Sequence, residues 1–255
     1  MNPLLRTLAA AVVLVVVAAA PAALLAAPAA LAVAPGAPST HGAPAARPPA
    51  LQPGELRVLL AGMPRGDAAR GQRLHAQQFC ASCHGAQGVA PTPNWPHVAG
   101  QRADYTYKML VDYQRGIRQE GERARLMHDV TRDMAPQDMA DIAAWYATLP
   151  LPVEPLTPRP AATVPVAQLV RHGDPARLIT PCASCHGVQG QGGRPGSPAL
   201  AGQNPQYFVR TLQQYHGGQR DNDPKRGMRA FAQRLTAAEV DALATHYADL
   251  TAPRR

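Results

Sequence analysis

Aromatic residues are scarce in this 255-residue chain, where phenylalanine, tyrosine and tryptophan together make up 5% of the sequence. Its apolar content of 46% is therefore mostly alanine, valine and leucine, and it is accompanied by 27 prolines and 21 glycines. Such a composition favours short helices with proline-rich connections. Convincing strand patterns are also lacking, and no βαβ unit is recognisable. The length allows one large domain or two small ones.

Charge is almost absent from residues 1–32, in which Arg6 is the only charged side chain. An unbroken apolar run covers residues 8–20. The pattern predicts an export signal, cleaved at its end, and hence a periplasmic protein. An uncleaved membrane anchor is the alternative, although Pro21 and Pro28 would kink such a helix.

Two further segments are rich in proline and poor in residues that could form a core. Residues 33–65 begin with a long stretch of alanine and proline, which predicts a disordered tether. Residues 151–165 predict an extended linker. These segments delimit two domains, over residues 66–150 and 166–255.

The two domains are copies of each other. The sequence Cys-Ala-Ser-Cys-His-Gly at residues 80–85 recurs at residues 182–187, and the register continues from residues 96–101 to residues 198–203. One residue is lost later, after which Met127 pairs with Met228 and Tyr146 with Tyr247. Each copy is therefore expected to have the same fold.

The periodicity of apolar residues predicts helices in both copies. Residues 103–116 and 205–217 carry apolar side chains at three- and four-residue spacing, and both segments end in glycine. A last helix is predicted from Pro136 to Leu149 and, after a capping box that starts at Thr236, up to Leu250. With no strand predicted, the fold class is all-α.

Each Cys-x-x-Cys-His motif is the attachment signal for a c-type haem, because two thiols bond to the two vinyl groups and the adjacent histidine reaches the iron. The two intervening residues form a helical turn that places both sulfur atoms on the same side. The predicted attachment residues are Cys80, Cys83, Cys182 and Cys185, and the predicted histidine ligands of the two haem irons are His84 and His186.

A zinc site and a redox-active disulfide are the alternative interpretations of these cysteines. The two pairs of a zinc ribbon are separated by roughly 15 to 20 residues, whereas 98 residues lie between Cys83 and Cys182. A thioredoxin-like motif would accompany a βαβ pattern, which is lacking. We therefore predict two covalently bound haem c groups.

The sixth ligand of each iron is predicted from the repeat. Met228 is the only methionine after His186, and among the methionines that follow His84 only Met127 has a methionine counterpart. The others are predicted to be core side chains; they are Met109, Met134 and Met139. Two histidines that lack a counterpart, His128 and His216, remain as rival ligands.

A proline follows each haem histidine after 12 residues, at Pro96 and Pro198. A ligating histidine normally donates its second ring N–H to a fixed acceptor, often a backbone carbonyl. Each proline would hold its loop rigid and leave its carbonyl free to accept that hydrogen bond.

With histidine, proline and methionine in this order twice, residues 66–250 resemble the class I cytochromes c, and more narrowly the two-domain, dihaem c-four type. The resemblance implies His84 and Met127 as ligands of one iron and His186 and Met228 as ligands of the other. It further implies two domains packed about a pseudo-twofold axis, and electron transfer from a quinol-oxidising complex toward a terminal oxidase.

Three functions therefore remain open: an electron carrier, an electron-transfer subunit of a larger dehydrogenase or oxidase, and a dihaem peroxidase. A peroxidase needs an open iron position, whereas both copies keep a candidate methionine, so we expect a carrier rather than an enzyme. Residues 163–255 contain 11 basic and six acidic side chains, against nine of each in residues 66–150. This charge could steer the chain toward an acidic redox partner or an anionic membrane surface, and nucleic acid is not an expected partner.

Overall fold

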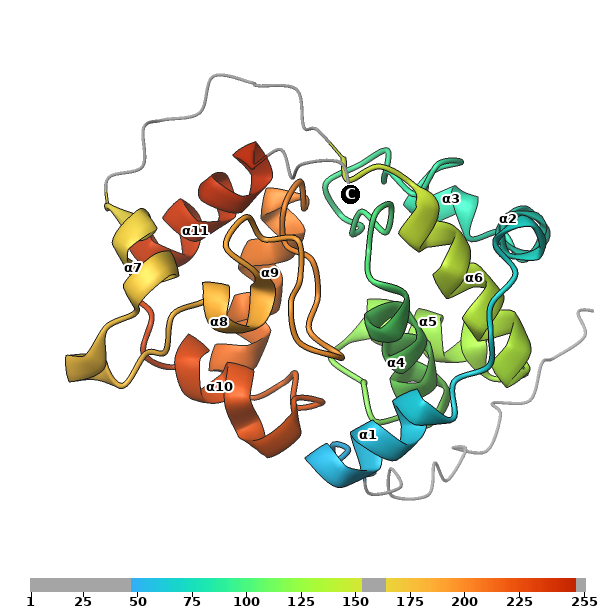
Figure 1. Cartoon of the computed structure of the whole chain (residues 1–255), viewed down its shortest axis with the longest axis horizontal. Coiled ribbons are helices and arrows are strands. Elements are labelled where there is room, and N and C mark those ends of the chain that lie inside the picture. The colour runs from blue at the N-terminus through green and yellow to red at the C-terminus, as the bar shows by residue number, and fades with distance from the viewer. Residues whose placement is uncertain (1–46, 153–163, 251–255) are drawn as a thin grey trace, which may run out of the picture. The chain divides into compact units, whose positions relative to one another are not determined.

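The regular elements are helical throughout the part of the chain that the computed structural model describes, residues 47–152 and 164–250. The one β feature there is an isolated bridge between Asp174 and Ile179. The all-α prediction is therefore confirmed (Figure 1). These residues belong to one compact unit, which covers residues 45–255. Within them, no helix has both the length and the apolar character needed to span a bilayer. The predicted export signal lies outside the described residues.

The first copy is built on the contact between its second and last helices. Helix α2 packs against α6, and α4 packs against both α5 and α6. Met139, Ile142 and Trp145 from α6 are buried in the core between these helices. The helices of this copy are α1 (Pro53–Ala61), α2 (Ala68–Gln77), α3 (Ala81–His84), α4 (Ala103–Gln114), α5 (Glu122–Thr131) and α6 (Pro136–Thr148).

The second copy repeats this arrangement with shorter helices at its start. Helix α11 packs on α9 and α7, and α10 packs on α9. The predicted capping box is present, because the Thr236 hydroxyl accepts from the Glu239 N–H while the Glu239 carboxylate accepts from the Thr236 N–H. The elements are α7 (Val166–His172), η1 (Pro175–Arg177), α8 (Ala183–His186), α9 (Pro205–His216), η2 (Pro224–Arg226), α10 (Gly227–Ala232) and α11 (Ala237–Asp249).

The same backbone hydrogen bonds recur in both copies at the repeat spacing. The Gly100 N–H donates to the Tyr146 carbonyl at 2.9 Å, and the Gly202 N–H donates to the Tyr247 carbonyl at 2.8 Å. Each bond ties the loop after the haem motif to the last helix of its copy. Residues that correspond in the sequence repeat therefore make the same contacts in the two copies.

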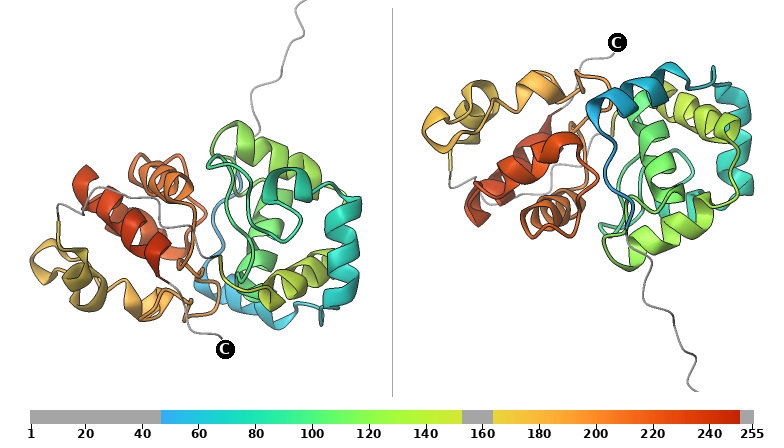
Figure 2. Two further views of the ribbon diagram at one scale, coloured as in Figure 1. Left: turned by 90° about the horizontal axis from the view of Figure 1, so that it is seen from above. Right: turned by 90° about the horizontal axis from the view of Figure 1, so that it is seen from below.

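Helix α1 corrects the expectation of a disordered tether over residues 33–65 for residues 53–61, whereas residues 33–46 lie outside the described part of the chain. Residues 53–61 are helical, and the Glu55 carboxylate accepts from the Gln52 N–H at 2.7 Å, which caps the helix start. Three apolar side chains in and just after the helix pack on the core of the first copy; they are Leu59, Leu60 and Met63. Arg47, just before the helix, forms an ion pair with Asp221 of the second copy at 2.8 Å. Helix α1 accordingly lies beside the border between the two groups of helices (Figure 2).

Two glutamines join the copies through equivalent contacts. The Gln101 side chain donates to the Ala199 carbonyl at 3.0 Å and accepts from the Ala199 N–H at 2.8 Å. The Gln203 side chain donates to the His97 carbonyl at 3.0 Å and accepts from the His97 N–H at 2.9 Å. Both glutamines are buried. Because Gln101 corresponds to Gln203 and His97 to Ala199, the two copies are related by a pseudo-twofold axis at this interface.

Candidate functional site

Each Cys-x-x-Cys-His motif folds as a single helical turn, α3 in the first copy and α8 in the second. The His84 N–H donates to the Cys80 carbonyl at 2.9 Å, which closes the turn over the two cysteines. Gly85 ends the turn with a φ of +73°, a conformation that favours glycine. A β-carbon at Gly85 would also collide with the Val89 carbonyl oxygen. The glycine after each histidine is therefore required by the turn itself.

Both motif histidines are buried and are held through Nδ1. The distance from His84 Nδ1 to the Pro96 carbonyl oxygen is 3.1 Å, and that from His186 Nδ1 to the Pro198 carbonyl oxygen is 3.0 Å. A carbonyl can only accept, so Nδ1 carries the proton in each ring. Burial lowers the pKa of both histidines, which favours the neutral form with Nε2 as the metal-binding nitrogen.

The two predicted methionine ligands occupy corresponding places. Met127 lies in α5 and Met228 in α10, and each is half-buried against the core of its own copy. Met134 and Met139 are buried in the first core, as predicted. Of the rival histidines, His128 has its Nδ1 2.8 Å from the Tyr113 carbonyl oxygen, and His216 is exposed at the end of α9.

His75 is a residue of this site that the sequence pattern did not reveal. Its Nε2 lies 3.0 Å from the Gly85 carbonyl oxygen and its Nδ1 lies 2.8 Å from the Tyr146 hydroxyl. Its ring centroid is 4.6 Å from that of Trp145. His75 thus fixes the end of the first motif against α6. The repeat gave no signal for it, because Arg177 stands at the matching position.

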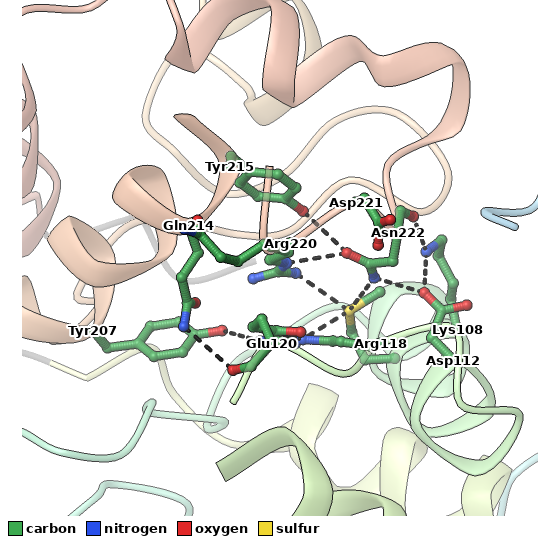
Figure 3. A network of polar contacts seen from close by, with 12 residues as sticks. Lys108, Asp112, Arg118, Glu120, Tyr207, Gln214, Tyr215, Arg220, Asp221 and Asn222 are labelled. Atoms are coloured by element: carbon green, nitrogen blue, oxygen red, sulfur yellow. Dashed lines mark hydrogen bonds and ion pairs between the residues drawn. The ribbon is translucent and has the colours of Figure 1, made fainter. Parts of the chain in front are cut away.

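A buried polar cluster joins the two copies (Figure 3). Arg118 of the first copy donates to Glu120 at 2.5 Å and lies 3.5 Å from the Tyr207 hydroxyl of the second copy. Met109, predicted to be a core side chain, is buried here, and its sulfur accepts from two guanidinium groups and an amide. We call this group the interdomain cluster; its members are Lys108, Met109, Asp112, Arg118, Glu120, Tyr207, Gln214, Tyr215, Arg220 and Asn222.

The interdomain cluster has a place for an anionic cofactor group. Arg220 is 2% exposed, and its hydrogen-bond partners within the described part of the chain are neutral: the Asn222 amide, the Tyr105 hydroxyl and the Met109 sulfur. A buried guanidinium without a carboxylate is costly. The propionates of a haem would supply the missing negative charge, so the residues present fit the predicted cofactor.

Comparison with known proteins shows the family to which the chain belongs. The sequence profile of the cytochrome c family matches residues 68–150 and 176–250. Cytochrome c4 of Thiocapsa roseopersicina is 33% identical over 188 residues, which cover 73% of this chain and 94% of that protein. The thiosulfate dehydrogenase electron acceptor of Stutzerimonas stutzeri is 31% identical over 195 residues, which cover 73% of this chain and 88% of that protein.

A solved structure shares the fold as well. The crystal structure of reduced recombinant cytochrome c4 from Pseudomonas stutzeri superposes with a TM-score of 0.63 at 30% sequence identity, over 72% of this chain and 99% of that one. The profile match falls on both copies, each with its own attachment motif, so the prediction of two covalent haem c groups is confirmed. The chain therefore belongs to the cytochrome c family, as a dihaem electron-transfer protein of the cytochrome c4 type.

Proposed function

We propose that this chain carries single electrons in the periplasm, from a quinol-oxidising complex to a terminal oxidase, and that it is not itself an enzyme. The observation that carries this proposal is that both copies hold the same set of candidate residues in equivalent places. In each copy the motif histidine is bound to its proline carbonyl and a methionine lies against the core. Two equivalent sites of this kind suit reversible electron transfer better than chemistry at an open iron position.

The proposed ligands follow the repeat. His84 and Met127 would hold the first iron, and His186 and Met228 the second, with the two cysteines of each motif as thioether links. Haem c supplies a one-electron iron couple when bound, and methionine ligation raises its reduction potential. Pro96 and Pro198 fix the orientation of the two imidazoles through their carbonyl groups.

The methionine ligands predict a near-infrared charge-transfer band between methionine sulfur and ferric iron. In the oxidised protein, its intensity is expected to account for two haems. The substitution Met228→Leu should remove half of the band and leave a ligand position open. Met134→Leu is the matched control, because it exchanges a buried core methionine of similar volume and should leave the whole band. A full band in Met228→Leu protein would exclude this residue as a ligand.

A second candidate function is that of dedicated electron acceptor for a dehydrogenase. Its support is the relative named as a thiosulfate dehydrogenase electron acceptor. The two candidates share the haem sites and differ in the donor protein. Neither requires peroxide to bind, so high-spin iron that binds peroxide would contradict both of them.

Purification of the chain from its native cells separates the two candidates. A carrier is expected in the periplasmic extract, free of other subunits, and is expected to be oxidised rapidly by solubilised terminal oxidase. The excess of basic side chains in residues 163–255 predicts that this rate falls as salt is added. Recovery in fixed stoichiometry with a dehydrogenase, through high salt, would show a complex subunit instead.

A further inference from the structure

The two arginines of the interdomain cluster occupy matching positions in the two copies. Arg118 and Arg220 are 5% and 2% exposed. Each guanidinium lies over a tyrosine of its own copy at 4.6 Å from the ring centroid, Arg118 over Tyr113 and Arg220 over Tyr215. Since the copies share one fold, each arginine stands in the same relation to the haem site of its own copy.

The residue two positions after each arginine breaks this equivalence. In the first copy it is Glu120, whose carboxylate is 2.5 Å from Arg118 Nε and whose side chain is 3% exposed. In the second copy it is Asn222, whose amide oxygen is 3.1 Å from Arg220 Nε. The guanidinium group of Arg118 is therefore held by an anion, and the corresponding group of Arg220 is held by a neutral amide.

A second pair of positions in the interdomain cluster repeats the difference. Asp112 forms a buried ion pair with Lys108 in the first copy, where the second copy has Gln214 and Arg210. Both basic positions are thus kept in the second copy, while both acidic positions become amides. The four groups sum to zero charge in the first copy and to two positive charges in the second, where Arg220 is buried and Arg210 is half-buried outside the interdomain cluster.

Buried charge of this kind acts on a redox centre. The ferric form of a haem carries one more positive charge than the ferrous form, so a nearby carboxylate favours the oxidised state. The effect extends over several ångströms, because a buried site screens charge less than water does. Glu120 contacts Arg118 directly and acts more weakly on Arg220, so its carboxylate offsets the charge of Arg118 more than that of Arg220.

We infer that Glu120 is a tuning residue, which lowers the reduction potential of the haem in the first copy relative to that in the second. The inference rests on the haem sites proposed above.

The test is Glu120→Gln in the full-length dihaem protein, with the potential of each haem followed by NMR of its methyl resonances during a redox titration. The first potential is expected to rise, with little change in the second. The equilibrium constant for electron exchange between the copies should fall on the order of tenfold, which corresponds to about 59 mV for a one-electron couple. The matched control is Glu122→Gln, which removes the same charge from a side chain that is 93% exposed and should leave both potentials nearly unchanged.

A reciprocal variant keeps the test decisive should Glu120→Gln fail to fold. Asn222→Asp adds a carboxylate beside Arg220. It is expected to lower the reduction potential of the haem in the second copy and so to reduce the difference between the two potentials. The inference is overturned if Glu120→Gln changes the difference between the two reduction potentials no more than the control does, or raises both potentials equally. It is also overturned if Asn222→Asp increases that difference. The haem content and the near-infrared band of these variants are measured as well. If both are normal, the proposed iron ligands are in place, and a negative result then concerns only the role of Glu120.

Discussion

Replacing both Cys182 and Cys185 with serine is expected to give a protein that carries one haem and has an unfolded second copy. Aromatic residues make up only 5% of the chain, so the core of each copy depends on small apolar side chains and on the large apolar surface of the haem. Cys182 itself packs against the second core. Without thioether links, the haem dissociates into the dilute solution and its contribution to folding is lost.

Mass spectrometry of the intact protein and a haem assay measure the loss, and limited proteolysis locates the unfolded copy. Replacing Cys80 and Cys83 instead is the mirror control, which should spare the haem of the second copy. A second copy that stays protease-resistant without its haem would contradict the dependence of the core on the cofactor.

Exchange of Gly71 for alanine is expected to destabilise the first copy by about 3 kcal/mol, at the upper end of the usual cost of overpacking. Gly71 is buried in α2, where it meets the backbone of α6. A β-carbon there would overlap the Asp141 carbonyl oxygen. Backbone cannot rotate away as a side chain can, so the two helices would have to separate.

Denaturation by guanidinium chloride at constant haem content measures this cost. The matched control is Gly54→Ala in α1, because no heavy atom lies within 4 Å of a β-carbon built at Gly54. That exchange should be neutral, or stabilising by up to about 1 kcal/mol, since alanine favours the helix. Equal stability of the Gly71→Ala protein and the control would show that α2 and α6 have room to adjust.

Local patterns in the sequence were sufficient to predict most of the fold. The helices predicted over residues 103–116 and 205–217 end as α4 at Gln114 and α9 at His216, because the glycine-containing ends mark their stops. The helix at residues 53–61 was missed, because the alanine and proline before it dominated the composition of the segment. Its apolar side chains have a partner only once the first core exists.

The sequence repeat predicted those residues of the candidate site that have an equivalent residue in the other copy. The bonds from His84 to Pro96 and from His186 to Pro198 follow from equal spacing in the two copies. His75 lacked a counterpart, and its contacts are tertiary. Gln101 and Gln203 matched in sequence, but nothing in a linear pattern shows that each binds the other copy.

The reciprocal bonds of these two glutamines have the form of an isologous interface, in which the same patch is used on both sides. Such a surface would serve equally well between two separate identical subunits. The glutamine contacts that relate the two halves are thus present in each half, and a peptide connection between the halves raises their effective concentration. The two halves differ in their buried charges, as Glu120 and Asn222 show, whereas the glutamine contact that relates them is the same in both.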